Sequence, residues 1–188
     1  MKPSFKQFVK EDSNLVIETE RLILEPITPD HAEEMFFLLQ DSRLYKFIPQ
    51  DPPSLELLKK RYQVWQGRKS PDETEVWLNW AAKNRATSKY IGHFQSGWDA
   101  KGGFSIAYTV GVDFQNQGYA REAVASVVAF LKTKMNADAV RSWVDTRNQA
   151  SIGLMKTLGF EKIGFIKDAD EFKGSKSDEY IFERAFNA

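Results

Sequence analysis

The sequence contains no cysteine and only two histidines among its 188 residues. Without cysteine the chain has no disulfides, thiolate zinc sites, iron–sulfur clusters or cysteine nucleophile. His31 and His93 have no histidine or cysteine close by that would complete a metal site, so for each we favour a surface or packing role. We therefore expect a metal-free protein of a reducing compartment, the cytoplasm.

The sequence also has no surplus of charge of one sign, because 26 lysines and arginines balance 26 aspartates and glutamates. Proteins that bind nucleic acid directly usually carry a clustered basic surplus. The most apolar stretch, residues 123–131, is shorter than the roughly 18 residues that a membrane-spanning helix requires. Residues 1–13 contain no apolar stretch typical of a secretory signal. We therefore expect no direct contact with nucleic acid and no membrane segment.

Apolar residues, by contrast, make up 42% of the chain, which is enough for a well-packed core. The length corresponds to one domain at about 100–200 residues per domain. We assign residues 1–14 to an N-terminal extension and residues 15–188 to the domain.

Hydrophobic periodicity predicts about seven strands and about four helices in this domain. Two helices follow the proline-containing turns at Pro29 and Pro53, and the others span Gly118–Met135, with a continuous apolar stripe, and Ser151–Leu158. Strands are predicted over residues 16–24, 75–83, 89–95, 104–112, 140–145, 160–167 and 179–186, with a charged loop over 168–178. This order predicts an α+β fold, a single domain with a mixed and mostly antiparallel sheet flanked by helices.

Common nucleotide-binding and hydrolase motifs are absent from the sequence. There is no G-x-G-x-x-G and no G-x-x-x-x-G-K-S/T. Residues 103–107 come close to the nucleophile elbow of hydrolases, but they lie within a predicted strand and no helix follows directly. We therefore expect Ser105 to be an ordinary strand residue.

Residues 112–123 combine a strand end, a polar turn with a glycine and the start of an apolar helix. Such a turn directs free backbone N–H groups at one point, aided by the positive end of the helix dipole. Gly118 and Ala120 are small enough for a bulky anion to approach the backbone. The pattern suits a pyrophosphate, and an ordinary strand–helix connection is the alternative.

The motif Gln115-x-x-Gly118-x-Ala120 resembles the acyl-CoA motif Q/R-x-x-G-x-G/A of the GNAT N-acetyltransferase family. Its extension over residues 118–123 resembles the branch of that family that acetylates ribosomal-protein N-termini. Residues 148–160 resemble the family's N-x-x-S-x-x-L-x-x-x-L-G-F segment, residues 19–26 the branch's opening strand and residues 89–92 its third strand. The two central motifs, in the order and spacing of the family, carry the resemblance over nearly the whole chain.

The resemblance implies a GNAT fold, acetyl-CoA as the acyl donor, CoA as a product and a primary amine as the acceptor. It places the pyrophosphate on the backbone amides of Gln117, Gly118, Tyr119, Ala120 and Arg121. Gln115 would help to hold the turn that presents these amides.

The resemblance also implies how the rest of the donor is held. The strand end Tyr108–Val112 would offer backbone groups, at Val110 and Val112, to the pantetheine arm, and Gly111 would mark the bulge that splays this strand. Asn148 and Ser151 would meet the pantetheine and the thioester sulfur. Lys156 and Arg121 would lie near the phosphates, with a solvated helix face as the alternative for each.

For catalysis, the resemblance implies a backbone N–H near Val110 as the donor to the oxyanion. Many relatives carry a tyrosine acid in the last small helix, where this chain has Met155. Ser151 is then the best remaining donor to the departing thiolate. Its ordinary alternative role is the N-cap of the helix, and the two roles can coexist.

The general base stays open at this stage. Relatives in this branch often have a glutamate near the position of Ser105, and this chain lacks it. Possible substitutes are Glu75, His93, Asp145 or water alone. Glu122 matches the family motif, and we expect it to be structural. Six aromatic residues would either line an acceptor groove or fill the core: Tyr45, Phe47, Trp65, Trp77, Trp80 and Trp98.

We therefore expect an N-acetyltransferase that moves an acetyl group from acetyl-CoA directly to a primary amine, first of all the N-terminus of a peptide or protein. A small amine such as a polyamine, an amino sugar, an aminoglycoside or an amino acid is the alternative acceptor. A catalytically silent acetyl-CoA-binding module is the alternative class, because the tyrosine and the glutamate are missing. Both a monomer and a homodimer stay open.

Overall fold

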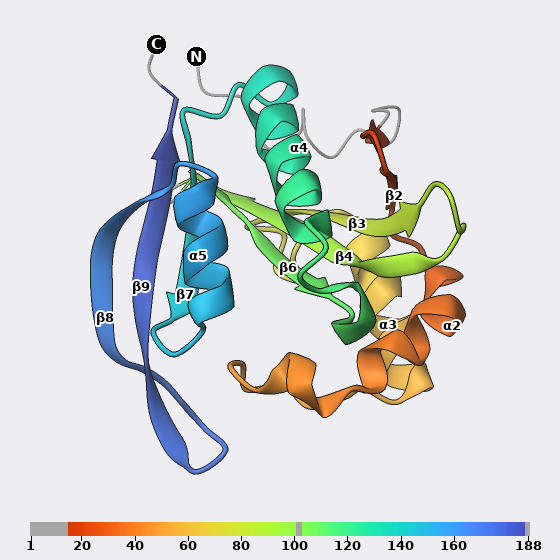
Figure 1. The fold of residues 1–188 in the computed structure, drawn as a ribbon, viewed down its shortest axis with the longest axis horizontal. Coiled ribbons are helices and arrows are strands. Elements are labelled where there is room, and N and C mark those ends of the chain that lie inside the picture. Colours follow the sequence, from red (N-terminus) through yellow and green to blue (C-terminus); the bar gives the residue numbers. More distant parts are fainter. Residues whose placement is uncertain (1–14, 101–102, 187–188) are drawn as a thin grey trace.

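The computed structural model describes residues 15–100 and 103–186, so the N-terminal extension expected over residues 1–14 lies outside it. Over these residues the chain builds one nine-stranded sheet in the order β1-β2-β3-β4-β5-β7-β9-β8, with β6 paired to β4 (Figure 1). The strands are β1 (Ile17–Glu18), β2 (Leu22–Pro26), β3 (Val76–Asn84), β4 (Tyr90–Asp99), β5 (Gly103–Ser105), β6 (Ala107–Val110), β7 (Ala139–Asp145), β8 (Glu161–Phe172) and β9 (Ser175–Ala185). Apart from the parallel pair β5–β7, the pairs are antiparallel, which confirms the predicted α+β fold.

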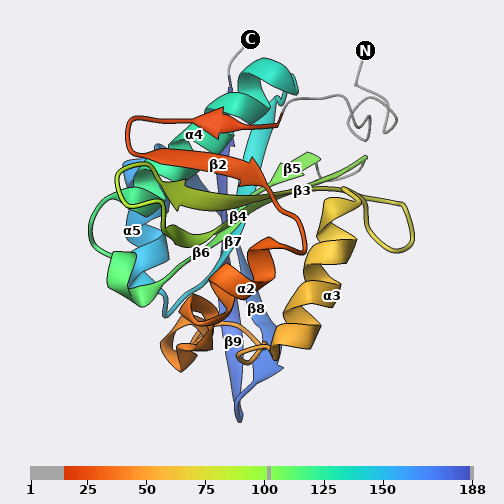
Figure 2. The same ribbon diagram turned by 90° about the vertical axis from the view of Figure 1, so that its right-hand side faces the viewer.

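Helices cover both faces of the sheet (Figure 2). The α-helices are α2 (His31–Phe36), α3 (Leu55–Gln66), α4 (Tyr119–Lys134) and α5 (Gln149–Thr157), and short 3-10 turns are η1 (Leu38–Gln40), η2 (Ser42–Tyr45) and η3 (Val112–Phe114). Buried residues of α4 and α5 pack with most of the sheet in one apolar cluster, whereas α2 and α3 form a second cluster with Ala81. The sheet is therefore packed on both sides, as its apolar content requires.

The predicted first strand over residues 16–24 is wrong, because the chain folds back on itself within it. β1 and β2 are short antiparallel partners, joined by a turn in which the Thr19 N–H donates to the Leu22 carbonyl and the Leu22 N–H donates to the Thr19 hydroxyl, each at 2.9 Å. A period-two apolar pattern reports which side chains are buried, and it is the same on either side of a tight turn. The pattern therefore hid the turn.

The predicted strand over residues 104–112 also divides in two. β5 pairs with both β4 and β7, and the Ile106 N–H still donates to the Arg141 carbonyl at 2.8 Å. β6 then pairs with β4 alone, so the sheet opens between β6 and β7. These two divisions raise the number of strands from the predicted seven to nine.

Gly111 does not mark this opening, so the expectation of a splaying bulge there is wrong. The Gly111 N–H donates to the Ile91 carbonyl at 2.8 Å, which continues the pairing with β4. A Cβ atom at Gly111 would lie 2.6 Å from the Leu38 Cγ. Glycine is required here because η1 packs against the strand end, and the opening begins earlier, at Ile106.

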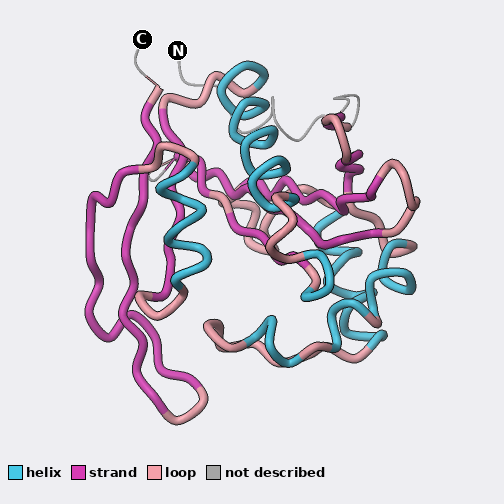
Figure 3. Tube along the Cα trace, viewed as in Figure 1, coloured by secondary structure: helices cyan, strands magenta, loops and turns pink. Residues whose placement is uncertain are grey.

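The charged loop predicted over residues 168–178 is also wrong, because these residues extend the last two strands into a long hairpin (Figure 3). β8 and β9 are joined at Lys173 and Gly174, which have φ angles of 53° and 74°. Two consecutive residues with positive φ form the tight turn that suits the twist of a β-hairpin. Charged side chains suit an exposed hairpin as well as they suit a loop, so composition did not separate the two.

Glu122, in the first turn of α4, ties this helix to the turn between β1 and β2. Its carboxylate accepts hydrogen bonds from the Thr19 hydroxyl at 2.5 Å, the Arg21 N–H at 2.8 Å and the Arg21 Nε at 2.6 Å. Burial alone would raise the pKa of Glu122, but these hydrogen bonds outweigh burial and lower it. The structural role expected for Glu122 is confirmed.

Replacing Glu122 with alanine should therefore destabilise the fold. We expect Glu122→Ala to lower the free energy of unfolding by about 2 kcal/mol, toward the low end for charged hydrogen bonds because Arg21 is partly exposed. Urea unfolding measures this change. Glu33→Ala, which removes an exposed ion pair with Lys59, is the control and should change little. Equal effects of the two substitutions would contradict the role of Glu122.

Candidate active site

A cavity of about 460 Å³ lies where the sheet opens beside β6. Its walls come from the segment around η2, the end of β6, the turn before α4 and the first turns of α4 and α5. We call it the strand cavity. Its lining is Arg43, Leu44, Phe47, Ile48, Tyr108, Thr109, Val110, Phe114, Gln115, Asn116, Gly118, Tyr119, Ala120, Arg121, Asn148, Ala150, Ser151 and Leu154.

The end of β6 presents its backbone to this cavity. Because Gly111 is hydrogen-bonded to Ile91, the alternation of antiparallel pairs turns the backbone groups of the preceding Val110 away from β4. The Val110 carbonyl accepts from the Gln115 Nε2 at 3.0 Å, so the Gln115 side chain holds the turn onto β6. The Val110 N–H points toward the same open edge.

The turn before α4 ends in a glycine with left-handed backbone. Gly118 has a φ of 81° and is the N-cap of α4, where no side chain caps the helix. The first helical bond runs from the Glu122 N–H to the Gly118 carbonyl. The N–H groups of Tyr119, Ala120 and Arg121 precede that bond and have no acceptor within the helix.

This helix start fits a large anion. The free N–H groups and the helix dipole attract negative charge, and a Cβ atom at Gly118 would lie 3.3 Å from the Arg21 Nη2. Arg21 also donates to the Gln117 carbonyl at 3.0 Å and lies over the ring of Tyr119, 4.4 Å from its centroid. Arg21 therefore holds the turn on one side, and the other side of the turn faces the strand cavity.

The start of α5 is capped by Asn148 and not by Ser151. The Asn148 Oδ1 accepts from the Ser151 N–H at 3.1 Å, so the alternative of Ser151 as the N-cap is wrong. The Ser151 hydroxyl is free of that role, and it accepts instead from the hydroxyl of Tyr108 at 3.1 Å. Two hydroxyl groups therefore meet in the strand cavity, one from β6 and one from α5.

Tyr108 is a candidate residue that the sequence did not single out. Its ring stacks on Phe94, with centroids 6.2 Å apart, and burial raises the pKa of its hydroxyl, partly offset by the bond to Ser151. An aromatic residue in an alternating strand predicts core packing, and the ring does pack so. The usable signal was its position two residues before Val110, on the strand that leads into the glycine turn.

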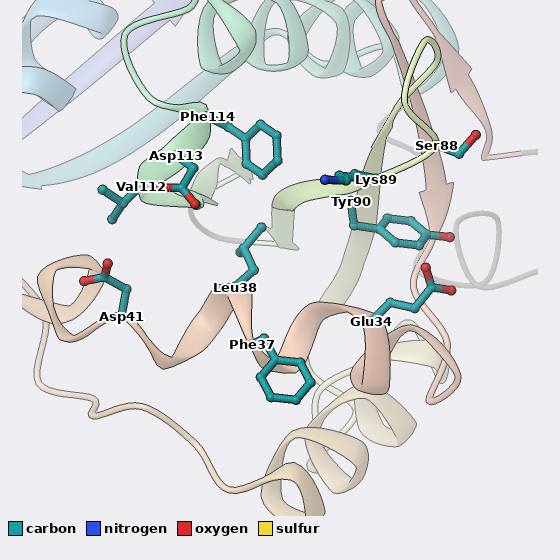
Figure 4. A pocket seen from close by; sticks show the side chains of 11 residues that line it. Glu34, Phe37, Leu38, Asp41, Ser88, Lys89, Tyr90, Val112, Asp113 and Phe114 are labelled. Carbon is teal, nitrogen blue, oxygen red and sulfur yellow. The ribbon is translucent and has the colours of Figure 1, made fainter.

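The remaining predicted residues lie elsewhere. Gln117, Val112 and Lys156 do not line the strand cavity. Val112 lines a second cavity of about 500 Å³ on the outer side of η3, where it lies with Asp113 and Phe114 across from η1 (Figure 4). Met155, at the position of the tyrosine found in many relatives, is fully buried in the core.

None of the three candidate bases lines the strand cavity. The Glu75 carboxylate accepts from the Trp77 Nε1 at 2.7 Å. Asp145 pairs with Arg147 at 2.6 Å; burial alone would raise the pKa of Asp145, but the arginine outweighs burial and lowers it. His93 is buried against the rings of Tyr62 and Trp65, which confirms its expected packing role.

The aromatic residues proposed for an acceptor groove mostly fill the interior. Trp80 is fully buried and donates from Nε1 to the Leu15 carbonyl, Tyr45 is buried, and Trp65 stacks on Tyr62. Of the six, Phe47 lines the strand cavity.

A sheet that opens beside a helix start rich in free amides is the architecture of an acyl-CoA-binding transferase. Residues 21–161 match the model of the acetyltransferase (GNAT) domain, so the chain belongs to the GNAT acetyltransferase family. The protein is an acetyl-CoA-dependent N-acetyltransferase. Among residues 15–100 and 103–186, no helix is both long and apolar enough to cross a membrane.

Known proteins resemble the chain over most of its length. The N-acetyltransferase YoaA of Bacillus subtilis is 22% identical over 169 residues, which cover 89% of this chain and 94% of that protein. A GNAT acetyltransferase from Bacillus anthracis has a similar fold, with a TM-score of 0.79 at 18% identity over 91% of this chain and 98% of that one. So does an acetyltransferase from Salmonella typhimurium that modifies the N-terminal serine of ribosomal protein L7/L12, with a TM-score of 0.77 at 16% identity over 92% and 99%.

His93 makes the stability of the fold depend on pH. Burial, with a smaller contribution from Arg61, lowers the pKa of His93 from 6.5 to about 4. Below pH 6.5 the unfolded chain therefore binds a proton that the folded chain does not, so this contribution to stability is complete above pH 6.5 and is lost as the pH falls toward 4.

We expect His93 to account for a loss of about 2 kcal/mol in the free energy of unfolding between pH 7 and pH 5. His93→Gln should remove this part of the pH dependence, whatever its stability at pH 7. Urea unfolding of both proteins at a series of pH values measures the difference. Parallel curves for the two proteins would show that His93 is not neutral in the fold.

Proposed function

We propose that the acceptor is the α-amine at the N-terminus of a peptide or protein, and that the strand cavity holds the donor. The observation that carries this choice is the charge of the lining. Among the residues that the structure describes, the strand cavity is lined by two arginines, Arg43 and Arg121, and by no carboxylate. Arg43 is itself paired with Asp41 at 2.5 Å, so what decides against a polyamine or an aminoglycoside is that the lining offers no carboxylate to bind their several positive charges.

The absence of a carboxylate also bears on how the amine loses its proton. An α-amine has an ordinary pKa near 7.8, so roughly a tenth of it is neutral at pH 7, whereas an alkylamine with a pKa near 10.4 is neutral in fewer than about one molecule in a thousand. With water as the proton acceptor, the reactive neutral form is therefore roughly 300 times more abundant for the α-amine than for the alkylamine at pH 7. The site then favours N-terminal amines without any contact that recognises them.

We assign the donor to the residues that face the cavity. The amides of Gly118, Tyr119, Ala120 and Arg121, which line the cavity, would hold the pyrophosphate at the start of α4 together with the amide of Gln117, which precedes them in the turn. The open edge of β6, at Val110, would pair with the pantetheine arm, and Asn148 and Ser151 would close the opposite side. We assign residues 15–188 to the one domain that carries this site.

Acetyl-CoA supplies an activated acetyl group and a thiolate leaving group. The Val110 N–H, fixed by β6 and by the Gln115 side chain on the same residue, points into the site as a donor for the acyl oxygen. The Tyr108 hydroxyl keeps its proton at neutral pH, because the pKa of an ordinary tyrosine is near 10 and burial raises the pKa of Tyr108 further. Through Ser151, which accepts its hydrogen bond, Tyr108 can pass a proton to the departing sulfur.

Thiol release from acetyl-CoA tests the acceptor. The panel consists of short peptides with free N-termini, the same peptides with blocked N-termini and an internal lysine, a polyamine and an aminoglycoside. We expect the free N-termini to be preferred, with a rate that rises between pH 6 and about 8 as the α-amine loses its proton. A preference for the polyamine or the aminoglycoside would overturn the proposal.

Two glycine variants control for binding of the donor in the same assay. Gly118→Asp places a charged side chain at a left-handed residue beside the pyrophosphate site, so it should abolish CoA binding in calorimetry. Gly153→Ala adds a methyl group where no atom lies within 4 Å, and it should leave CoA binding intact. Unchanged CoA affinity in a folded Gly118→Asp protein would show that the donor binds elsewhere.

The hydroxyl pair makes a separate kinetic prediction. Tyr108→Phe and Ser151→Ala should each lower kcat, roughly 100-fold for a lost proton donor, while the Kd of CoA stays near that of the wild type. Tyr90→Phe, which removes a hydroxyl bonded to Glu25 outside the strand cavity, is the matched control. An unchanged kcat in both site variants would remove the pair from the mechanism.

A further inference from the structure

Lys173, at the tip of the β8–β9 hairpin, binds a distant backbone segment through its ammonium group. The Nζ donates to the carbonyls of Ile48 and Gln50, both at 3.1 Å, and to that of Tyr45. The carboxylate of Asp51 lies 3.7 Å away. Three carbonyl groups of one short segment therefore converge on a single side chain that is more than 120 residues away in sequence.

The segment that Lys173 binds forms one wall of the strand cavity. Phe47 and Ile48 line the cavity, and they lie between the carbonyls that Lys173 gathers. Buried Tyr45 fixes the start of this segment, because its hydroxyl donates to the Leu39 carbonyl at 2.9 Å. Between that anchor and Asp51, Lys173 is the side chain that holds the segment, through three of its carbonyls.

The same hairpin tip also contacts the opposite wall. Arg147 donates from Nη1 to the Ser175 hydroxyl at 3.2 Å, and its guanidinium lies over the ring of Phe172, 5.7 Å from the centroid. Arg147 is held in turn by Asp145 and directly precedes Asn148, the cap of α5. The tip therefore joins the segment after η2 to the turn before α5, as its place beside the orange segment in Figure 1 indicates.

We propose that Lys173 is a positioning residue that holds the Phe47–Ile48 wall over the donor thioester and so keeps water out. This rests on the placement of acetyl-CoA in the strand cavity. If water enters, its oxygen bonds to the acyl carbon and the carbon–sulfur bond breaks, and the products are acetate, a proton and the CoA thiol. Lys173 thereby determines how much of the thiol released is coupled to acetylation of an amine.

The test uses Lys173→Met, which keeps the length of the side chain and removes its charge and donors. Lys176→Met is the matched control, because Lys176 lies on the same hairpin and pairs with exposed Asp168 at 3.1 Å. Lys173→Arg should restore the contact, because it keeps the charge and several donors. Thermal unfolding of each protein establishes that it is folded.

The first readout needs no acceptor and no activity. Trypsin cleavage after Lys46, which lies within the bound segment, is followed by mass spectrometry. We expect cleavage of Lys173→Met to be about tenfold faster than that of the wild type, because local opening of the segment becomes more frequent. Lys176→Met and Lys173→Arg should behave like the wild type. Equal cleavage rates in all four proteins would overturn the proposal.

The second readout is the ratio of thiol release without an acceptor to thiol release with one, at saturating acetyl-CoA. It should rise several-fold in Lys173→Met and also in Phe47→Ala, which removes part of the wall without touching the lysine. Faster cleavage with an unchanged ratio would overturn the role of the wall in excluding water. The ratio is defined for whichever amine is acetylated, so a wrong acceptor assignment and a wrong role for Lys173 give different results.

Discussion

The opening of the sheet after Ile106 is the constraint on which the rest of the site depends. β5 and β6 both pair with β4, so the opening lies on the side away from β4, where β6 separates from β7. The backbone of Val110 thereby faces a cavity in place of a neighbouring strand. Because β5 and β7 are parallel, the chain must also cross over through a helix, and that helix is α4. One topological step therefore produces both the open strand edge and, beside it, the helix start that attracts an anion.

The start of α4 serves this purpose only if it is held still. Glu122 and Arg21 hold it in place. The Glu122 carboxylate joins the helix to the turn between β1 and β2. The Arg21 guanidinium binds the Gln117 carbonyl and lies over the ring of Tyr119. The amides of Tyr119, Ala120 and Arg121, on the side of the strand cavity, have no acceptor within the helix. The motif residues thus divide into those that line the strand cavity, such as Gly118 and Ala120, and those that hold the turn, such as Glu122.

The sequence predicted what depends on short stretches of chain and missed what depends on how distant stretches meet. The glycine turn, the helix after it and the short helix α5 are each set by local patterns and were visible, although α5 is capped by Asn148 and not by Ser151. The break at Ile106 was not, because burial alternates on both sides of it. The sequence placed Tyr108 on a strand end that offers backbone groups, and nothing local indicated that its hydroxyl would meet Ser151. None of the candidate bases Glu75, Asp145 and His93 lines the strand cavity, and the sequence could not show this because their partners lie on distant stretches of the chain.

In the proposed function, the lack of a carboxylate in the described lining of the strand cavity makes proton availability part of the specificity. A general base would lower the barrier for every amine and would reduce the difference between an α-amine and a lysine side chain. A site that relies on water keeps the full difference in the pKa of the two amines. Such a site must then admit an amine while it keeps bulk water from the thioester. The Phe47–Ile48 wall, held by the β8–β9 hairpin, is proposed to meet both requirements, because the Lys173 contact fixes the wall and leaves the open edge of β6 in place.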